Sequence, residues 1–474
     1  MASFDVIFIG GGPAGYVGAI RCAQLGMSVA VIEREKLGGT CVVWGCIPAK
    51  ALLESAALAN RVRHAQEFGV TVGKISVDYG VAMKRSRSVS AQNVKGVEFL
   101  MKKNKVTFIP GTGALAGGKA VTVKGTGGKE EKHEAKKAIV IATGSRVKGL
   151  PQAGLELNGT TVISSDEALV LEKAPRTMAI VGAGAVGCEF ADVFNAFGAA
   201  VTLIEIAPVI LPLEDADVSA ELAKSFQKRK IDVLAGATIE GAKVGKKSVV
   251  LTVSARAQGK GAEGRKRDIE VEMVLVAAGR APVTDGIGLE TAGVKLDERG
   301  FIRIDQGMQT SAKGVYAIGD VAGPPMLAHK GSREGVVLAE LLAGEKPHPV
   351  DYGNVPNATY CHPEVASVGL TEQQCKEKKL DYRIGTFAFA NNGRARTSGE
   401  TDGFVKIIRD SKYGEILGAH IIGAHATELL HELVVARANE FTVEEVDLAI
   451  HAHPTLAEAV AEAALDSMGK MLHA

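Results

Sequence analysis

The sequence of 474 residues predicts an α/β protein that contains two copies of one strand-turn-helix-strand unit and ends in an α+β domain. Three observations predict this fold. A motif of closely spaced glycines follows a short apolar run twice, the chain holds 56 glycines without a Gly-X-Y period, and alternating apolar runs precede helical patterns near the C-terminus. Glycine makes up about 12% of the chain where about 7% is usual, which indicates backbone that approaches a ligand closely.

The first unit lies at the N-terminus. Residues 5–9 form an apolar run typical of a strand, residues 16–25 follow a helical pattern, and residues 28–32 form a second apolar run that ends at Glu33. The first Gly of G-x-G-x-x-G permits a tight turn, the second lets a pyrophosphate approach the backbone, and the third lets helix and strand pack. These residues are Gly10, Gly12 and Gly15. Glu33 is placed to bind a ribose hydroxyl, so the unit predicts a dinucleotide site.

The second unit repeats the first at a constant offset, since 182 − 10, 184 − 12, 187 − 15 and 205 − 33 all equal 172. Its glycines are Gly182, Gly184 and Gly187, and its acidic residue is Glu205. No Lys or Arg follows Glu205 before Lys224, whereas an NADP site needs a basic residue near the 2′-phosphate, so NAD is favoured at this site. Two dinucleotide sites suggest two cofactors that exchange electrons. The alternative is two glycine turns in unrelated α/β units.

Cys41 and Cys46 follow the first unit at the start of a helical stretch. A zinc or iron-sulfur site would need further ligands at short spacing, so we expect no metal and a redox-active cysteine pair, with a thiolate that the helix N-terminus stabilises. The alternative is a pair of buried small apolar side chains, which is our interpretation of Cys22, Cys188, Cys361 and Cys375.

Composition narrows the class of protein. The charge balance of 55 basic and 54 acidic residues gives a net charge of +1, which does not suggest nucleic acid as a partner. Six cysteines in a chain of this length are too few for a disulfide scaffold, and residues 1–9 lack the features of a signal peptide. No run of 18 apolar residues suggests a membrane span, so we expect a cytoplasmic protein.

Six further motifs carry a resemblance: GGTCVVWGCIPAK at 38–50, ATGS at 142–145, GRAP at 279–282, VYAIGD at 315–320, MLAH at 326–329 and HAHPTLAE at 451–458. On these motifs the chain resembles the flavoprotein disulfide reductases over essentially its whole length, and most of all their dihydrolipoamide-oxidising members. The resemblance implies FAD on the first fingerprint, NAD on the second, a homodimer, and NAD-dependent oxidation of protein-bound dihydrolipoamide in 2-oxo acid dehydrogenase complexes.

The implied partners are the lipoyl domain and the subunit-binding domain of an E2 acyltransferase core, or the lipoyl protein of glycine cleavage. Glutathione reductase and mercuric reductase are the alternatives within the family. The first would require basic residues after Glu205 and the second a C-terminal cysteine pair, but the chain ends in MLHA. Two positions depart from the common pattern of the family, since Val43 stands where Asn is usual and Cys361 where Thr is common.

The resemblance also implies a set of site residues. Those implied for FAD are Gly10, Gly12, Gly15, Glu33, Thr40, Lys50, Gly113, Thr143, Gly144, Ser145, Asp320, Met326, Leu327, Ala328 and His329. Those implied for NAD are Gly182, Gly184, Gly187, Glu205, Ile239 and Gly279, and the catalytic residues are Cys41, Cys46, Lys50, Glu189, His453 and Glu458.

The catalytic residues have different implied roles. Cys46 faces the flavin, Cys41 exchanges with the substrate dithiol, and Lys50 lies beside the flavin and pairs with Glu189. His453 reaches the disulfide of the other subunit as a base, since imidazole accepts a thiol proton near neutral pH, and Glu458 orients its ring.

The domain boundaries follow from these assignments. We expect a first FAD segment over residues 1–150, the NAD-binding domain over 151–280, a second FAD segment over 281–348 and the dimerisation domain over 349–474. Residues 110–140 predict a β-ribbon, and the charged stretch 255–267 predicts a hairpin tip. In the last domain we expect strands over 404–409 and 416–422 and helices that begin near residues 426, 442 and 455.

Overall fold

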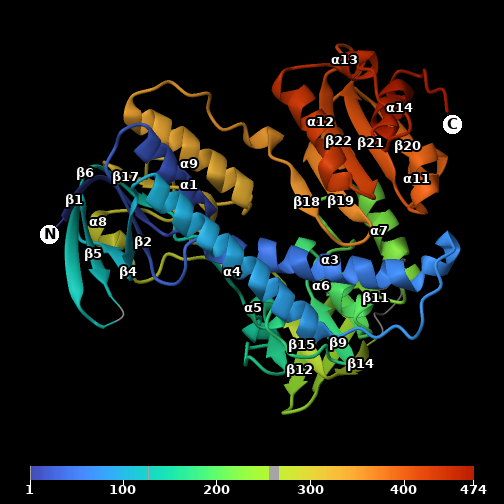
Figure 1. The fold of residues 1–474 in the computed structure, drawn as a ribbon, viewed down its shortest axis with the longest axis horizontal. Helices are drawn as coiled ribbons and strands as arrows, with labels where there is room; N and C mark the ends of the chain where they lie inside the picture. The colour runs from blue at the N-terminus through green and yellow to red at the C-terminus, as the bar shows by residue number, and fades with distance from the viewer. Residues whose placement is uncertain (1, 126, 256–265, 474) are drawn as a thin grey trace. The chain divides into compact units, whose positions relative to one another are not determined.

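The computed structural model describes residues 2–125, 127–255 and 266–473 (Figure 1), which divide into two compact units. Unit 1 comprises the residues up to 51 together with 83–148 and 279–352. Unit 2 comprises residues 52–82, 149–278 and those from 353 onward. Each unit therefore consists of three separate stretches of the chain.

Unit 1 is built on a seven-stranded sheet in the order β3-β2-β1-β6-β5-β4, with β17 also paired to β6. Strands β1, β2, β3 and β17 form parallel pairs, whereas β4, β5 and β6 form the antiparallel ribbon predicted for residues 110–140, which is confirmed. The strands are β1 (Ala2–Ile9), β2 (Val29–Glu33), β3 (Thr107–Pro110), β4 (Thr112–Leu115), β5 (Ala120–Lys124), β6 (Glu130–Ile141) and β17 (Val315–Ala317).

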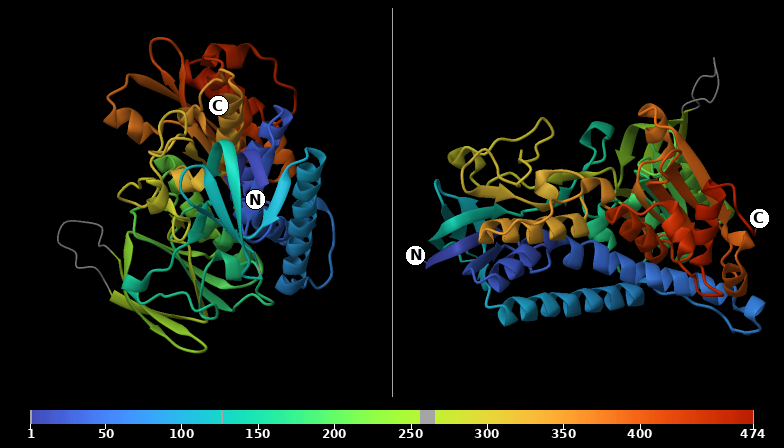
Figure 2. Two further views of the ribbon diagram at one scale, coloured as in Figure 1. Left: turned by 90° about the vertical axis from the view of Figure 1, so that its left-hand side faces the viewer. Right: turned by 90° about the horizontal axis from the view of Figure 1, so that it is seen from above.

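Two helices of unit 1, α1 (Pro13–Gln24) and α9 (Ala328–Ala343), lie side by side, as Figures 1 and 2 both show. Glycine permits their close approach, because a Cβ on Gly335 would lie 2.7 Å from the Ala14 carbonyl oxygen. The predicted helix over 16–25 begins three residues earlier, at Pro13, because proline at the first helical position has its φ already set and lacks only an N–H that would be unpaired there.

The remaining elements of unit 1 are helices and short strands outside the main sheet, and they carry the other sequence motifs. The cysteine motif forms α2 (Gly39–Val43) and the start of α3 (Cys46–Arg63), and α4 (Tyr79–Lys103) contributes its residues from 83 onward. Further elements are β7 (Ser145–Val147), paired with β16 (Arg280–Pro282), α8 (Leu289–Ala292) and η3 (Gly319–Ala322). By length and hydropathy alone Gly39–Arg63 could cross a membrane, but this test is weak, because core helices of soluble proteins also pass it.

The first part of unit 2 contains the second glycine motif. Its parallel sheet has the order β11-β10-β9-β15-β8, and β12, β13 and β14 form a separate antiparallel sheet. The elements are η2 (Pro151–Ala153), β8 (Val162–Ile163), α5 (Ser165–Ala168), β9 (Thr177–Val181), α6 (Ala185–Ala196), β10 (Ala200–Glu205), α7 (Ala216–Lys228), β11 (Asp232–Ala235), β12 (Ala237–Val244), β13 (Val249–Ala255), β14 (Lys266–Val271) and β15 (Met273–Val276). The predicted hairpin tip falls on residues 256–265, which lie outside the described residues.

The C-terminal part of unit 2 is an antiparallel sheet in the order β18-β19-β22-β21-β20 (Figure 1). Residues of α12, α13 and α14 share its apolar core. The predicted strands and helices are confirmed, although the last helix begins at Glu458 and not near Thr455. The elements are η4 (Tyr352–Asn354), β18 (Asn357–Thr359), β19 (Glu364–Gly369), α10 (Glu372–Glu377), β20 (Tyr382–Ala388), η5 (Phe389–Asn391), α11 (Gly393–Ser398), β21 (Phe404–Asp410), β22 (Ile416–Gly423), α12 (Ala426–Ala438), α13 (Val443–Leu448) and α14 (Glu458–Ser467).

A buried lysine joins the two parts of unit 2. The side chain of Lys406 on β21 is 2% exposed, and its ammonium donates to three carboxylates. Asp215 and Asp217, at the start of α7, lie 2.9 and 2.5 Å away, and Glu372 of α10 lies 2.9 Å away. Because a buried charge is costly unless it is paired, this cluster fixes α7 against the C-terminal sheet.

Candidate functional site

The three glycines of the first fingerprint meet different surroundings. Gly10 has a φ of +112°, and a Cβ there would lie 2.1 Å from the Ala142 carbonyl oxygen. A Cβ on Gly15 would lie 2.0 Å from the Gly10 carbonyl oxygen. At Gly12, by contrast, the nearest atom to a Cβ is 3.9 Å away. The fold itself therefore requires glycine at 10 and 15, whereas Gly12 leaves room at the N-terminus of α1 that suits a pyrophosphate.

The second fingerprint repeats this arrangement. Gly182 has a φ of +99°, and a Cβ there would lie 2.6 Å from the Ala277 carbonyl oxygen. A Cβ on Gly187 would lie 1.8 Å from the Gly182 carbonyl oxygen, while a Cβ on Gly184 would meet nothing within 4 Å. In both copies of the fingerprint, the middle glycine is therefore the one that the packing of the turn does not require. It lies at a helix N-terminus, a position that stabilises an anionic ligand.

The two acidic residues of the fingerprints, Glu33 and Glu205, make the same hydrogen bonds. In each carboxylate, one oxygen accepts a main-chain N–H of the glycine turn, and the other oxygen accepts the main-chain N–H of the residue two positions after the glutamate. The donors are Gly11 and Glu35 to Glu33, at 2.8 and 2.9 Å, and Ala183 and Ala207 to Glu205, at 2.7 and 2.8 Å. Because a carboxylate oxygen has further acceptor capacity, both residues can still bind a ribose hydroxyl, and they also fix the turn that would hold the pyrophosphate.

Cys41 in α2 and Cys46 at the start of α3 form no disulfide and are joined by a hydrogen bond. The hydrogen bond to Cys46, burial and the negative charge of Cys46 raise the pKa of Cys41 well above its ordinary value, whereas the charge of Lys50 lowers it. A stabilised thiolate within the pair, which the sequence does not assign to one cysteine, stays a prediction.

The other four cysteines have a different environment. All of them are buried, with exposed fractions of 0 or 1%. Burial raises the pKa of Cys22 to about 12 and raises that of Cys188, Cys361 and Cys375. A high pKa disfavours the reactive thiolate, so the prediction that these four thiols are small buried side chains is confirmed.

Lys50 and Glu189 belong to different units. Lys50 lies one turn after Cys46, and its charge acts on Cys41. Glu189 in α6 is 5% exposed, and its carboxylate accepts the main-chain N–H of Tyr360 at 3.0 Å. The predicted pairing of Lys50 with Glu189 stays a prediction.

Asp320 is oriented by side chains from two other motifs. The Ser145 hydroxyl donates to the Asp320 carboxylate at 2.5 Å, and the Arg280 guanidinium donates to the Ser145 hydroxyl oxygen at 2.7 Å. In the same segment the Thr143 hydroxyl donates to the Val283 carbonyl at 2.7 Å, and Gly144 has a φ of +72°. Residues from 143–145, 280–283 and 320 thus form one polar network in unit 1.

The turn that carries Asp320 rests on two buried charges that the sequence analysis missed. Lys330 and Glu334 in α9 are 2% and 1% exposed and pair at 3.2 Å. Lys330 donates to the carbonyls of Gly319 and Gly323 at 3.0 and 3.1 Å, and the Gly319 N–H donates to Glu334 at 2.7 Å. The sequence did hold a signal for this pair, because a Lys and a Glu four positions apart on an otherwise apolar helix face indicate a buried ion pair.

The remaining residues predicted for FAD lie at the N-terminus of α9. Met326 and Leu327 precede α9, and Ala328 and His329 begin it. A Cβ on Gly331, in the first turn of α9, would lie 3.0 Å from the Ala14 Cβ of α1. The N-termini of the two helices therefore meet, and both direct partial positive charge to one region of unit 1.

Four predicted residues have no direct link to these contacts. Thr40 is exposed in α2. Gly113 in β4 packs on the sheet, because a Cβ there would lie 3.1 Å from the side chain of Ile32. Ile239 packs on the apolar core of unit 2, and Gly279, with a φ of +114°, begins the last stretch of unit 1. Their contacts with FAD and NAD stay predictions.

His453 and Glu458 form the predicted pair. The ring Nδ1 lies 2.8 Å from Glu458, which also accepts the Thr455 N–H at 2.8 Å, and the His453 side chain is 79% exposed. Although burial raises the pKa of Glu458, its hydrogen bonds from Thr455 and His453 outweigh this effect and lower it. In the tautomer in which Nδ1–H donates to an ionised Glu458, the lone pair of the ring lies on Nε2.

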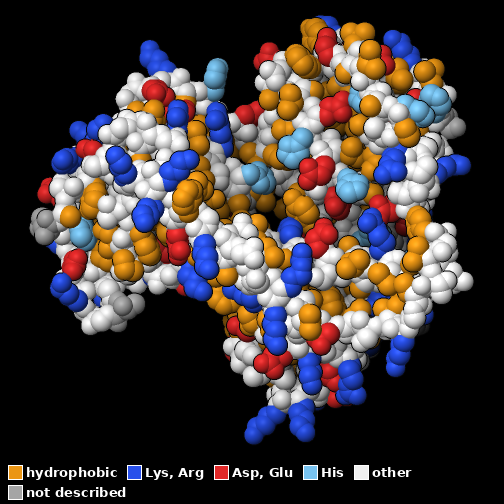
Figure 3. Space-filling model, viewed as in Figure 1, with side chains coloured by type: hydrophobic (Ala, Val, Ile, Leu, Met, Phe, Trp, Pro, Cys, Tyr) orange, Lys and Arg blue, Asp and Glu red, His pale blue; other side chains and the backbone are white. Residues whose placement is uncertain are grey.

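Four exposed apolar side chains lie between residues 435 and 450, in the stretch that leads to His453. Val435, Phe441, Leu448 and Ile450 are 57, 46, 77 and 101% exposed. Histidines also gather over the C-terminal elements on the face drawn in Figure 3. Apolar side chains at this exposure are typical of a surface that a second subunit covers.

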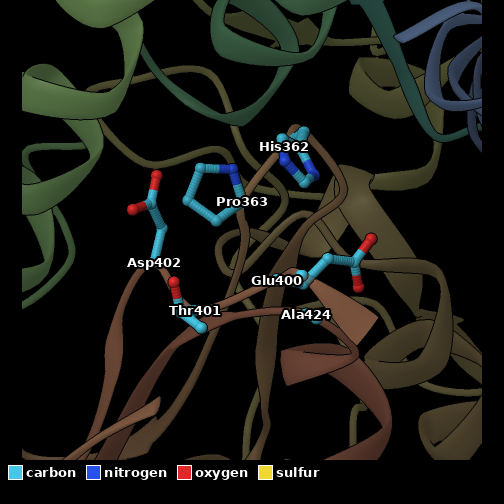
Figure 4. A pocket seen from close by; sticks show the side chains of 7 residues that line it. His362, Pro363, Glu400, Thr401, Asp402 and Ala424 are labelled. Carbon is cyan, nitrogen blue, oxygen red and sulfur yellow. The ribbon is translucent and has the colours of Figure 1, made fainter. Parts of the chain in front are cut away.

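A cavity of about 140 Å³ lies elsewhere in unit 2, lined by His362, Pro363, Gly399, Glu400, Thr401, Asp402 and Ala424 (Figure 4). None of the residues predicted for the site lines it. Both of its carboxylates are paired with a basic side chain that does not line the cavity, Glu400 with Arg61 at 3.2 Å and Asp402 with Lys228 at 3.2 Å. Among the described residues no three His, Cys, Asp or Glu side chains are grouped as metal ligands.

Comparisons with known proteins identify relatives that match over nearly the full length of the chain. A dihydrolipoyl dehydrogenase of Rhizobium etli is 43% identical over 492 aligned positions that cover 100% of this chain and 99% of the relative. One of Zymomonas mobilis is 43% identical, with 99% of each chain covered. The structure of LpdA from Mycobacterium tuberculosis matches with a TM-score of 0.89 and 27% identity, covering 98% of this chain and 99% of that one. The HOCl-induced flavoprotein disulfide reductase RclA from Escherichia coli matches with a TM-score of 0.84 and 27% identity over 97% of this chain and 99% of that one.

Two family models divide the chain between them. The model of the pyridine nucleotide-disulphide oxidoreductases matches residues 4–335, and the model of their dimerisation domain matches residues 355–464, so the protein is a homodimer. The fold predicted from the sequence, with two dinucleotide-binding units and a C-terminal dimerisation domain, is confirmed. The chain belongs to the pyridine nucleotide-disulphide oxidoreductase family and is an oxidoreductase whose cofactors are FAD and NAD.

Proposed function

We propose that the protein is a dihydrolipoyl dehydrogenase, which oxidises dihydrolipoamide to lipoamide and reduces NAD⁺ to NADH. The observation that carries the proposal is the hydrogen-bonded Cys41–Cys46 pair in the unit that holds the first fingerprint, in a chain that aligns over its full length with dihydrolipoyl dehydrogenases. The fingerprint residues of unit 1, with Asp320 and the segment 326–329, are assigned to FAD. Gly182, Gly184, Gly187 and Glu205 are assigned to NAD.

The substrate reaction is a thiol-disulfide exchange at Cys41. A thiolate of dihydrolipoamide attacks the sulfur of Cys41 in the oxidised pair, the Cys41–Cys46 bond breaks, and Cys46 leaves as a thiolate. The second substrate thiolate then attacks its own partner sulfur in the mixed disulfide, which forms lipoamide and releases Cys41. FAD, when bound, carries the two electrons of the cysteine pair to NAD⁺.

His453 of the partner subunit is the proposed base for the substrate thiol. Glu458 holds Nδ1–H at 2.8 Å, so Nε2 carries the free lone pair, and the exposed ring is accessible to a second subunit. Lys50 stabilises negative charge near the pair, because its charge lowers the pKa of Cys41.

The cofactor preference of the second site supports NAD over NADP. Glu205 is followed by Ile206, whose side chain is 72% exposed and offers no charge to a 2′-phosphate. A glutathione reductase would use NADPH and glutathione, so a comparison of the two cofactors and the two thiols tests both functions in one assay.

The decisive assay is NADH formation from dihydrolipoamide by the FAD-loaded homodimer. We expect Cys41→Ser to abolish this activity and His453→Gln to lower it at least a hundredfold. His473→Gln is a matched control, because His473 is also exposed and pairs with a glutamate of α14, Glu462, at 2.6 Å. Activity of Cys41→Ser near that of the wild type would refute the mechanism, and a preference for glutathione and NADPH would refute the function.

The proposal extends to the partner and the compartment. We propose that the lipoyl group arrives in trans on the lipoyl domain of an E2 acyltransferase, that the E2 subunit-binding domain holds the homodimer, and that the protein acts in the cytoplasm. Reduction of NAD⁺ with a purified dihydrolipoylated domain as the substrate tests the first point. A rate no higher than that with free dihydrolipoamide at the same concentration would count against a protein-borne substrate.

A further inference from the structure

The single tryptophan of the chain, Trp44, lies between the two cysteines and is held from two sides. Its indole N–H donates to the carboxylate of Glu35 at 2.5 Å, and the guanidinium carbon of Arg87 lies 4.8 Å from the centroid of its ring. A carboxylate on the N–H edge and a cation over the face attract the same ring, because the edge is positive and the face negative.

Arg87 also holds the backbone of the preceding residue. Its Nη1 donates to the Val43 carbonyl at 2.6 Å, and the main-chain N–H of Trp44 donates to the Thr40 carbonyl at 2.8 Å. Of the four residues that separate Cys41 from Cys46, Arg87 therefore contacts two. Val43 itself is 2% exposed and packs in a small apolar cluster with Val94 of α4.

Other side chains of α4 bond to the same segment. Ser90 donates to the Val42 carbonyl at 2.7 Å, and Ser86 donates to the Pro48 carbonyl at 2.8 Å. Both serines are buried, with exposed fractions of 2% and 0%. Because 86 and 90 are one helical turn apart and 87 is adjacent, one face of α4 fixes the backbone on both sides of the cysteine pair.

A fixed loop favours the disulfide over the dithiol. Closing a disulfide requires the two sulfurs to approach to about 2.0 Å with a defined torsion, and a loop that already holds them together raises their effective concentration. The reduced thiols in this structure are in hydrogen-bond contact. Loosening the loop would therefore stabilise the dithiol relative to the disulfide.

We propose that Arg87 is a positioning residue for the Cys41–Cys46 pair, and that the Glu35–Trp44–Arg87 group sets the thiol-disulfide equilibrium of the protein. The inference rests on the proposed redox function of the pair. It assigns a role to α4 and to the tryptophan that the two fingerprints do not require.

The test compares Arg87→Met with Arg85→Met in the FAD-loaded homodimer. Arg85 is a matched control, because it lies on the same helix and donates to a carbonyl, that of Ala51 at 3.0 Å, outside the cysteine loop. The equilibrium is read from the fraction of alkylated Cys41 and Cys46 in mixtures of reduced and oxidised dithiothreitol, and FAD content and the melting temperature report whether each variant is folded.

We expect Arg87→Met to shift the equilibrium three- to tenfold toward the dithiol, which corresponds to about 14 to 30 mV at 29.6 mV per tenfold change. Arg85→Met should shift it less than twofold. Glu35→Gln should shift the equilibrium in the same direction as Arg87→Met. In both variants the Trp44 ring should be more mobile, so its fluorescence anisotropy should fall. Arg87→Lys keeps the positive charge but loses the planar guanidinium, so its thiol-disulfide equilibrium should also shift toward the dithiol.

The sign of the shift decides between positioning and charge. If Arg87 acted by stabilising a thiolate, its removal would favour the disulfide, which would overturn the proposal. Equal shifts in Arg87→Met and Arg85→Met would overturn it as well. Because dithiothreitol replaces the substrate, failure of the wild type to oxidise dihydrolipoamide would refute the proposed function and leave this measurement valid.

Discussion

Gly184→Ala is expected to weaken NAD binding without destabilising the fold. The added Cβ would meet no protein atom within 4 Å, and the backbone of Gly184, with φ of −73° and ψ of −173°, is open to alanine. Because alanine allows the unfolded chain fewer conformations than glycine does, the free energy of unfolding should stay unchanged or rise by up to about 1 kcal/mol. Gly187→Ala is the matched contrast, because its Cβ would lie 1.8 Å from a carbonyl oxygen. The backbone shift needed there should cost about 1–3 kcal/mol.

The assay measures KM for NAD⁺ and the urea midpoint of each variant. We expect KM to rise at least tenfold in Gly184→Ala, about 1.4 kcal/mol of lost binding, with an unchanged midpoint. Gly187→Ala should lower the midpoint. The reasoning that the middle glycine serves the ligand alone fails if Gly184→Ala leaves KM unchanged, or if it destabilises the protein as much as Gly187→Ala does.

Three further outcomes follow from the side-chain contacts. Glu458→Gln should lower kcat with dihydrolipoamide about 10- to 100-fold, since the ring of His453 loses its orienting carboxylate, while NADH oxidation by an artificial acceptor stays normal. Lys330→Met leaves its buried partner carboxylate unpaired, so it should cost about 3–5 kcal/mol and release FAD in equilibrium dialysis. Hydrogen bonds from Lys376 and Lys406 lower the pKa of Glu372 from 4.5 to about 2, so its contribution of roughly 1–3 kcal/mol is complete above pH 4.5 and disappears as the pH falls toward 2. Unfolding free energies of the wild type and Glu372→Gln should therefore converge between pH 4.5 and pH 2, and a constant difference would contradict the shifted pKa.

The parts of the site that the sequence predicted are those that the chain encodes locally. Although Gly10 itself contacts Ala142, which is distant in the chain, the close contact of Gly15 with the Gly10 carbonyl is local, and the spacing of Gly10 and Gly15 is visible in the sequence. The same holds for Cys41 and Cys46. His453 lies next to its orienting Glu458 in the chain, so this pair could be found from a short motif.

The parts that the sequence did not predict depend on segments that are distant in the chain. Arg87 reaches Val43 and Trp44, and Lys406 reaches α7 across about 190 residues. Such a side chain looks like an ordinary surface lysine or arginine until the fold places a carbonyl, an aromatic ring or a carboxylate beside it. The raised pKa of Cys41 could not be predicted for the same reason, because it depends on the hydrogen bond to Cys46 and on burial.

The division of each unit into three stretches has a consequence for how the protein is made. The chain passes from one unit to the other after residues 51, 82, 148, 278 and 352, so no single cut separates them. During synthesis, unit 1 cannot complete its sheet until β17 has left the ribosome, and α1 lacks its neighbour α9 until still later, although the fingerprint is made within the first 33 residues. The first fingerprint must therefore wait, partly assembled, for most of translation. A fragment that stops before residue 315 should expose the β6 edge and aggregate, whereas a nick between units should leave both held in one complex.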